Sequence, residues 1–272
     1  MPSLSDLRLR FWIASSKRII GWVDDGGLLI RHLRRAPRPP VRPYPHIQTL
    51  RIPTQHGSLD ARLCLPNDTP TAALLICHGI GDRLVYWRKA QSLLREHNLV
   101  SLIFDYSGYG TSTGSISVAS LRHDSQSAYT HLRTTLPANT PVFLLGFSMG
   151  TGVATDATLT LDPAPAGLIL CQPFRSLRSG AQEVVLSSLL ARILPNVWRT
   201  AETIPLLKLP LLIVHSDADQ LFPLAHAHAI HSARLANTEL AIPTGFPHPG
   251  IYLNPTLAYW QPILDFINRT IS

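Results

Sequence analysis

The pentapeptide at positions 146–150, Gly-Phe-Ser-Met-Gly, is the pattern in this sequence best suited to nucleophilic chemistry. It separates an apolar run from a segment of helical character, and so sharp a strand-to-helix turn forces strained torsions on its apex residue, Ser148. Glycine at 146 and 150 fits because a Cβ atom at either position would collide with the opposite arm of the turn. The sequence therefore predicts a nucleophile elbow, with the Ser148 hydroxyl above the sheet edge and the Met149 amide facing a developing oxyanion.

A second oxyanion donor is predicted in the turn at 78–82, His-Gly-Ile-Gly-Asp, which follows another apolar run. Its glycines let the backbone approach a ligand closely, and we expect the amide of Ile80 to share the negative charge with that of Met149. Asp105 follows the next apolar run and could also be a catalytic acid. We interpret it instead as a residue that orders its own loop through backbone amides, as aspartates in turns commonly do.

Candidates for the acid and the base stand after the last two strand-like runs. Two carboxylates, Asp217 and Asp219, follow the run Leu211–Val214, and either could orient an imidazole. We prefer Asp219 because it lies further into the turn. His248 is the predicted base, because it lies after the final strand in a loop whose flanking prolines hold its backbone extended. His215, near Asp217, is the alternative base.

No pattern in the sequence indicates a metal or a cofactor. His226, His228 and His231 lie on one predicted helix at spacings of two and five, which do not share a face as residues i and i+4 would. The three cysteines stand in apolar runs without C-x-x-C spacing, which is typical of small buried hydrophobes in a reducing compartment. No apolar run reaches the roughly 18 residues of a membrane span, and we find no signal peptide, so we expect a cytoplasmic protein.

The elements that position these residues alternate along the chain. An antiparallel hairpin is expected over Ile47–Ile52 and Leu59–Leu65, because apolar and polar residues alternate there. Continuous apolar runs, typical of parallel strands covered on both faces, occupy Ala72–Cys77, Leu99–Phe104, Pro141–Leu145, Gly167–Leu170 and Leu211–Val214, with a last strand near Glu239–Ile242. Helices are expected near 84–97, 117–135, 149–161 and 224–236. The pattern predicts a doubly wound, mostly parallel eight-stranded α/β sheet, with its sites at the carboxyl ends of the strands.

Residues 1–45 differ in charge from the remainder. They hold nine of the 24 Lys and Arg residues but three of the 17 Asp and Glu residues, and so carry +6 of the net charge of +7. Apolar residues alternate with arginines up to about residue 24, which predicts a basic amphipathic helix. Such a helix suits an anionic membrane surface or a partner, and equally well packing on its own domain. Five prolines within 37–45 predict an extended connector.

The main domain, over 46–272, is nearly neutral and has no basic pattern that would indicate nucleic-acid binding. Within it, residues 174–205 separate the sixth and seventh strands, and we interpret them as a short helical lid. The stretch 183–194 is too apolar for a freely solvated helix, so it is expected to roof an apolar cleft or to pack on the core.

Together these motifs resemble the α/β-hydrolase superfamily over residues 47–270. The order Ser148, Asp219, His248 is the serine, acid, histidine order of that superfamily, and the turns at 78–79 and 105–110 match its motifs. Within it the chain is similar to small-lid serine hydrolases such as monoacylglycerol lipases and the serine aminopeptidase group. The resemblance implies a catalytic triad of Ser148, Asp219 and His248 and an oxyanion hole at Ile80 and Met149, with no cofactor.

The predicted function is hydrolysis of a carboxylic ester or thioester of an apolar acyl substrate through an acyl-enzyme. Two alternatives stay open. One is an aminopeptidase-like amide hydrolase, and the other is a weakly active binding protein that docks on membranes through residues 1–45. Substrate preference depends on lid side chains whose positions the sequence does not give.

Overall fold

The computed structural model describes residues 23–24, 27–28, 44–184 and 197–272. The basic helix predicted over the N-terminal arm lies almost wholly outside the described residues. Of that arm the structure describes only the short strands β1 (Val23–Asp24) and β2 (Gly27–Leu28), which pair antiparallel. The division of the chain at residues 45 and 46 stays a prediction.

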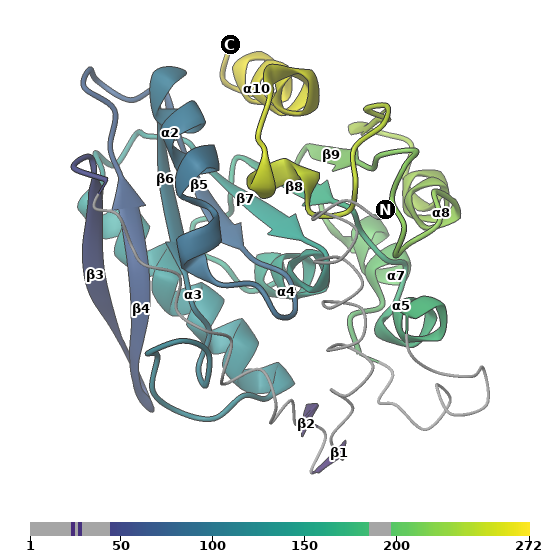
Figure 1. Ribbon diagram of the computed structural model, residues 1–272, viewed down its shortest axis with the longest axis horizontal. Helices are drawn as coiled ribbons and strands as arrows, with labels where there is room; N and C mark the ends of the chain where they lie inside the picture. The colour runs from purple at the N-terminus through teal and green to yellow at the C-terminus, as the bar shows by residue number, and fades with distance from the viewer. Residues whose placement is uncertain (1–22, 25–26, 29–43, 185–196) are drawn as a thin grey trace, which may run out of the picture.

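An eight-stranded sheet forms the centre of the described chain, as predicted (Figure 1). Its strands, in the spatial order β10-β9-β8-β7-β5-β6-β4-β3, are β3 (Ile47–Thr54), β4 (Gly57–Cys64), β5 (Ala72–Cys77), β6 (Leu99–Phe104), β7 (Val142–Phe147), β8 (Gly167–Cys171), β9 (Leu211–Val214) and β10 (Thr238–Ala241). The hairpin β3–β4 and the pair β4–β6 are antiparallel, and all other pairs are parallel. The carboxyl ends of β5 to β9 therefore meet at one edge, where the predicted site residues follow.

The five central strands are buried along their whole length, which explains their uninterrupted apolar sequences. Helices cover both faces, and they are η2 (Leu84–Tyr86), α2 (Arg88–Glu96), α3 (Val118–Thr135), α4 (Met149–Thr158), α5 (Leu177–Val184), α7 (Thr200–Thr203), η3 (Ile204–Leu206), α8 (Ala225–Ala233), α9 (Gly250–Leu253) and α10 (Leu257–Ile271). Alternate residues of each strand enter two cores, one under α3, α4 and α8 and the other under α2, α9 and α10. No described helix is long and apolar enough to cross a membrane.

Two elements differ from the sequence expectation. The helix expected over 84–97 is divided into the single turn η2 and the helix α2. The long C-terminal helix α10 was not predicted, and Pro262 lies inside it. Trp260 and Ile263 of α10 are fully buried in the second core, so packing of its apolar face outweighs the hydrogen bond that proline removes.

The predicted lid, residues 174–205, is described in part. Helix α5 opens it, and α7 and η3 close it, ahead of β9. Most of the apolar stretch 183–194, on which the prediction of a roof rests, lies outside the described residues.

Candidate active site

Ser148 lies at the apex of the predicted strand-turn-helix, between β7 and α4. Its backbone has φ 53° and ψ −119°, a strained conformation for a residue with a side chain. Close packing requires the flanking glycines, because a Cβ atom on Gly146 would lie 2.4 Å from the Gly150 oxygen. A Cβ atom on Gly150 would lie 1.9 Å from the oxygen of Cys77. The sequence therefore dictates this turn through steric exclusion.

The turn that carries Ile80 packs directly against the elbow. A Cβ atom on Gly79 would come within 3.2 Å of both the Ser148 Cβ atom and the ring of Phe147. Met149 is the first residue of α4, so its amide belongs to the free N-terminal turn of a helix. The two predicted oxyanion donors thus stand on segments that touch each other beside Ser148.

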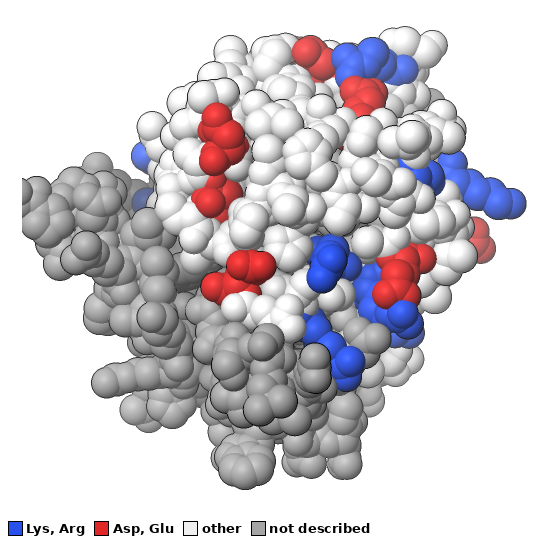
Figure 2. All heavy atoms as spheres, turned by 90° about the vertical axis from the view of Figure 1, so that its right-hand side faces the viewer, with Lys and Arg blue, Asp and Glu red and all other residues white. Residues whose placement is uncertain are grey.

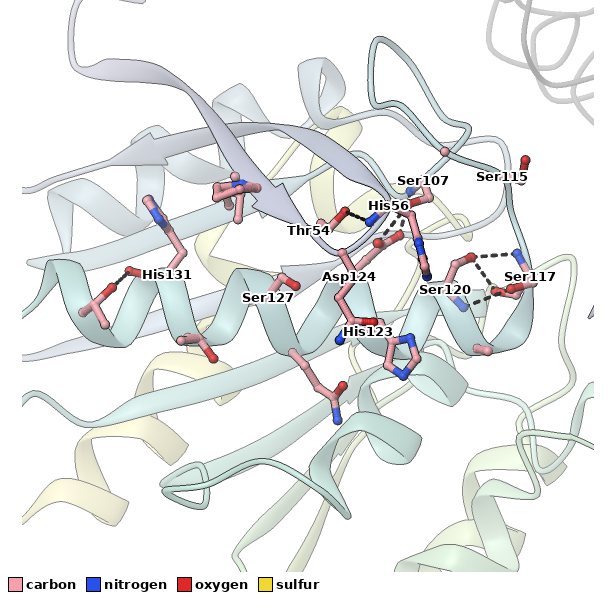
Figure 3. Close-up of a pocket in the computed structure, with 18 residues that line it drawn as sticks. Thr54, His56, Ser107, Ser115, Ser117, Ser120, His123, Asp124, Ser127 and His131 are labelled. Atoms are coloured by element: carbon pink, nitrogen blue, oxygen red, sulfur yellow. Dashed lines mark hydrogen bonds between the residues drawn. The ribbon is translucent and has the colours of Figure 1, made fainter.

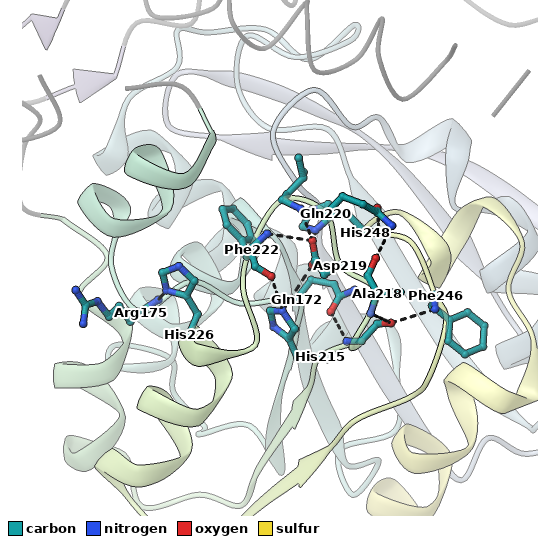
Figure 4. A network of polar contacts seen from close by, with 12 residues as sticks. Gln172, Arg175, His215, Ala218, Asp219, Gln220, Phe222, His226, Phe246 and His248 are labelled. Atoms are coloured by element: carbon teal, nitrogen blue, oxygen red, sulfur yellow. Dashed lines mark hydrogen bonds and ion pairs between the residues drawn. The ribbon is translucent and has the colours of Figure 1, made fainter. Parts of the chain in front are cut away.

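Asp219 and His248 form a direct hydrogen bond, from Nδ1 to Oδ2 over 2.7 Å (Figure 4). Both side chains are 1% exposed. The other carboxylate oxygen of Asp219 accepts the amides of Leu221 and Phe222 at 2.7 and 3.1 Å. Burial alone would raise the pKa of Asp219, but the charge of His248 and these hydrogen bonds together lower it, so the carboxylate is ionised near neutral pH.

The imidazole of His248 lies beside the elbow. Its ring centroid is 5.0 Å from that of Phe147, the residue before Ser148, and 5.3 Å from that of Phe222. A weak hydrogen bond from the His248 amide to Gln220, at 3.4 Å, ties the base loop to the acid loop. The structure therefore brings His248, Asp219 and the elbow together from three loops at one sheet edge.

The alternative acid and base have other partners. Asp217 is exposed and accepts the amide of Gly245 at 2.8 Å, so it orders the loop that leads to His248. His215 is fully buried, and its Nε2 lies 3.0 Å from the Phe222 carbonyl oxygen and 3.8 Å from Asp219. Burial lowers the pKa of His215, and the Phe222 carbonyl fixes its tautomer. Neither residue has the arrangement found at His248 and Asp219.

Asp105 has a different role from the one expected within its own loop. Its carboxylate accepts the amide of Leu84, at 2.8 Å, which belongs to the turn after β5. Its other oxygen fills the space of a side chain at Gly110, where a Cβ atom would lie 1.9 Å away. Burial raises the pKa of Asp105 to about 7, although the Leu84 amide and Arg83 oppose the shift. Asp105 therefore joins two neighbouring turns.

His226 and His228 of α8 lie in different surroundings. His226 is buried and accepts the amide of Arg175 on Nδ1 at 3.3 Å, whereas His228 is exposed. Burial lowers the pKa of His226 to about 4. In the part of the chain that the structure describes, no group of three or more His, Cys, Asp or Glu residues is arranged to hold a metal ion.

A groove of about 840 Å³ lies apart from the elbow, between the β3–β4 turn, the loop after β6 and α3 (Figure 3). We call it the polar groove because most of the residues that line it are of polar types. None of the predicted site residues lines it. Asp124 forms part of its floor, where Ser107 donates both its amide and its hydroxyl to the carboxylate at 2.7 and 2.9 Å. His56 and His123 flank this carboxylate at the groove surface.

Charges on the face shown in Figure 2 are mixed. Acidic and basic side chains of the described residues are interspersed there among uncharged ones, so this face has no extended field of one sign.

Solved structures with the same architecture include esterases. An esterase from Pyrococcus furiosus superposes with a TM-score of 0.67 at 18% identity, covering 83% of this chain and 93% of its own. A thermostable carboxyl esterase from Bacillus coagulans gives a TM-score of 0.64 at 15% identity, covering 84% of this chain and all of its own. At these identities the likeness shows the fold, and that fold is the α/β-hydrolase fold that the sequence resemblance implied.

A family model described as serine aminopeptidase, S33, matches residues 68–203, half of the sequence, and the chain therefore belongs to this family of α/β-hydrolase serine hydrolases. Its curated relatives include a lysophosphatidylserine lipase of Xenopus tropicalis, 27% identical over 70% of this chain and 54% of the relative. The bem46 protein of Schizosaccharomyces pombe is 31% identical over 61% of this chain and 58% of the relative. The chain thus spans just over half the length of these relatives.

Proposed function

We propose that this chain cleaves carboxylic ester or thioester bonds of an apolar acyl substrate through an acyl-enzyme, with Ser148, Asp219 and His248 as its catalytic triad. The observation that carries the proposal is the 2.7 Å bond between His248 and Asp219 beside a strained serine elbow. Membership of a serine hydrolase family and the names of the relatives, a lipase among them, support the same chemistry.

In the proposed triad, each nitrogen of the imidazole has its own role. Because Asp219 is an ionised acceptor, Nδ1 of His248 carries the proton, and Nε2 is then the basic nitrogen. In the proposed reaction, Nε2 takes the proton of Ser148 as its oxygen attacks the substrate carbonyl, and later gives it to the leaving group. Asp219 stabilises the imidazolium. Water then attacks the acyl-enzyme in the same way, with His248 again as the base, and releases the acid and free Ser148.

The amides of Ile80 and Met149 are the proposed oxyanion hole. One such donor typically contributes about 10² to 10³ in rate, because it is oriented before charge develops. The packing of the Gly79 turn against Ser148 supports this assignment. A bulky residue at position 79 would separate the two donors.

An apolar acyl group suits the surroundings of the elbow. Phe147 and Phe222 flank the imidazole, and the Phe174 ring packs 5.7 Å from that of Phe222, so these buried aromatic side chains surround the proposed base. Trp198 packs on α4 so closely that a Cβ atom on Gly152 would lie 2.6 Å from it. Aromatic side chains of this kind favour a hydrocarbon ligand over a charged one.

The proposal is tested by replacing the nucleophile. We expect Ser148→Ala to abolish labelling by a fluorophosphonate probe and to lower the turnover of p-nitrophenyl esters by about 10⁴-fold or more. Ser127→Ala, which changes a serine in the polar groove of α3, is the matched control and keeps both signals. Persistent labelling of Ser148→Ala would remove this residue from its role.

The family description favours amide hydrolysis as a second candidate. To distinguish amide from ester hydrolysis, the fluorophosphonate probe is made to compete with acyl esters of graded length and, separately, with aminoacyl amides. Protection that increases with acyl length supports the esterase, whereas protection by aminoacyl amides alone supports the peptidase.

A membrane location is proposed from the charge of residues 1–45, which carry +6. The full chain is then expected to sediment with anionic liposomes at low salt and to be released by high salt. Replacing Arg34 and Arg35 by Glu weakens this binding without changing ester turnover. Strong liposome binding together with inactivity on a broad ester panel would instead support a binding protein.

A further inference from the structure

Asp82 closes the turn that carries Ile80. It is 3% exposed, and its carboxylate accepts the amide of Gly79 at 3.2 Å. In return the Asp82 amide donates to the Gly79 carbonyl at 3.3 Å. The two residues that enclose Ile80 and Gly81 are therefore joined twice, and the carboxylate fixes the conformation of the turn.

The same carboxylate reaches the segment that follows His248. Burial raises the pKa of both Asp82 and Tyr252 of α9, and the two groups also affect each other: the hydroxyl opposes the rise at the carboxylate, and the carboxylate adds to the rise at the hydroxyl. The Tyr252 ring is held by Phe147 and Trp87, with centroids 5.5 and 5.0 Å away. Asp82 thus links the turn of the proposed oxyanion hole to Tyr252, four residues beyond the proposed base.

The charge of His248 also opposes the rise that burial causes in the pKa of Asp82, so the two groups interact electrostatically. The other titratable groups that face Asp82 are Tyr86, Tyr109 and Tyr252. Burial raises the pKa of all three hydroxyls, so they are neutral near pH 7. His248 is therefore a group near Asp82 whose charge changes during a proton transfer, and an ionised Asp82 would attract its positive form.

Resting on the proposed function, we propose that Asp82 is a second carboxylate that serves the triad as a positioning residue. It holds the oxyanion turn against α9 and, when ionised, stabilises the imidazolium that His248 becomes during acylation. Asp219 orients the imidazole by a direct bond, whereas Asp82 acts on it through space and through Tyr252. Burial raises the pKa of Asp82 to about 6, against the opposing effects of Tyr252, Gly79 and His248, so it is mostly ionised at pH 7.

Asp82→Asn tests the charge while its amide oxygen still accepts the Gly79 amide. We expect kcat for p-nitrophenyl esters to fall about tenfold with little change in KM, since the lost stabilisation acts on the transition state. The midpoint of the acid limb of kcat/KM is expected to move to lower pH by about half a unit, because removing a nearby negative charge disfavours protonation of the base. A purely structural Asp82 would leave that midpoint unchanged, which would overturn the proposal.

Asp124→Asn is the matched control. Asp124 is another buried carboxylate that accepts a backbone amide, yet it lies in the polar groove. This variant is expected to keep the wild-type midpoint. If both variants move the midpoint equally, the effect is general and the assignment to Asp82 is wrong.

Tyr252→Phe provides a second test, should Asp82→Asn fail to fold. It removes only the hydroxyl that faces Asp82, and we expect a several-fold fall in kcat. Unchanged kcat and an unchanged midpoint in folded Tyr252→Phe would overturn the proposed action of Asp82 through Tyr252. The two proposals fail separately: activity in Ser148→Ala removes the proposed triad, whereas an inactive Ser148→Ala with an unaltered Asp82→Asn removes only the role of Asp82.

Discussion

Two of the buried histidine–aspartate pairs at the carboxyl edge of the sheet, His248 with Asp219 and His78 with Asp105, differ in nearly every property except burial. In the pair of His248 and Asp219, Nδ1 and Oδ2 are 2.7 Å apart. In the pair of His78 and Asp105, Nε2 and Oδ1 are 3.6 Å apart, beyond a hydrogen bond. The four side chains are between 0 and 2% exposed. Burial therefore does not decide which pair can work as a base and its orienting acid.

The groups around each carboxylate make the difference, and at Asp219 the charge and hydrogen bond of His248 oppose the effect of burial most strongly. Asp219 accepts two backbone amides in addition to the imidazole, and its pKa is lowered. Asp105 accepts one amide, from Leu84, and burial raises its pKa to about 7. An acid that orients a base must stay ionised while the base gains a proton, and Asp219 meets that requirement better.

The histidines differ in the same sense. Nδ1 of His78 lies 2.8 Å from the carbonyl oxygen of its neighbour Gly79, and burial lowers the pKa of His78 to about 4. Its imidazole thus supports the turn in the neutral form. The comparison shows that one fold can use the same two residue types for a proposed catalytic pair and for a structural one.

The largest expected effect breaks the comparison at the base. His248→Ala should lower kcat by about 10⁴-fold or more on p-nitrophenyl esters, since His248 is the proposed acceptor of the serine proton. Free imidazole should restore part of the rate, because the variant leaves a cavity between Phe147 and Phe222. His78→Ala, measured in parallel, is expected to gain nothing from imidazole. Rescue of both variants alike would contradict the distinction.

A smaller effect separates the two acids. Asp219→Asn should reduce kcat by about 10³- to 10⁴-fold, because an amide at Oδ2 favours the wrong tautomer of His248. Asp105→Asn should change kcat by less than about tenfold while keeping the Leu84 amide bond. Steady-state kinetics on both purified variants, with thermal unfolding as the check on folding, measures this. Equal losses would mean that the pairs are not distinguished by their ionisation.

The pH dependence of stability should differ between Asp105 and His78, the two residues of the structural pair. The pKa of Asp105 is raised in the folded state, so its contribution is present below pH 4 and is lost as pH rises towards 7. The pKa of His78 is lowered, so its contribution is present above pH 6.5 and is lost as pH falls towards 4. The two contributions oppose each other in the intact protein.

Removing either group should therefore reveal the other. Relative to wild type, the free energy of unfolding of Asp105→Asn should rise between pH 5 and 7, and that of His78→Gln should fall, each by about 1 to 2 kcal/mol. Urea denaturation at pH 5, 6 and 7 gives these differences. Slopes of the same sign in both variants would show that the pair does not titrate as described.

The sequence predicted most of the fold because its signals are local. The runs Ala72–Cys77, Leu99–Phe104 and Leu211–Val214 coincide with strands, since burial on both faces leaves a continuous apolar record. The elbow is equally local, because sterics within five residues demand its glycines. Helix α10 was missed because Pro262 contradicts a helix locally, and only packing on the distant sheet overrides it.

Contacts between residues distant in the sequence could not be predicted, because no local pattern indicates them. The amide that binds Asp105 belongs to Leu84, 21 residues earlier, and the hydroxyl that faces Asp82 comes from Tyr252 at the far end of the chain. Depth in the turn and the family resemblance favour Asp219 over Asp217, but neither gives their surroundings: in the structure Asp219 accepts two backbone amides, whereas Asp217 is exposed.

The smallest expected effect concerns Asp217, the carboxylate closest in sequence to the proposed acid. It accepts the amide of Gly245, a residue at φ 82° three positions before His248, over 2.8 Å in solvent. Asp217→Asn keeps an acceptor oxygen, so kcat should change by no more than about twofold. Asp217→Ala releases the loop, and we expect a loss of about three- to tenfold, since an exposed hydrogen bond stabilises by about 1 kcal/mol. If Asp217→Asn instead lost as much activity as Asp219→Asn, the base would depend on both carboxylates, and the buried pair alone would not explain the site.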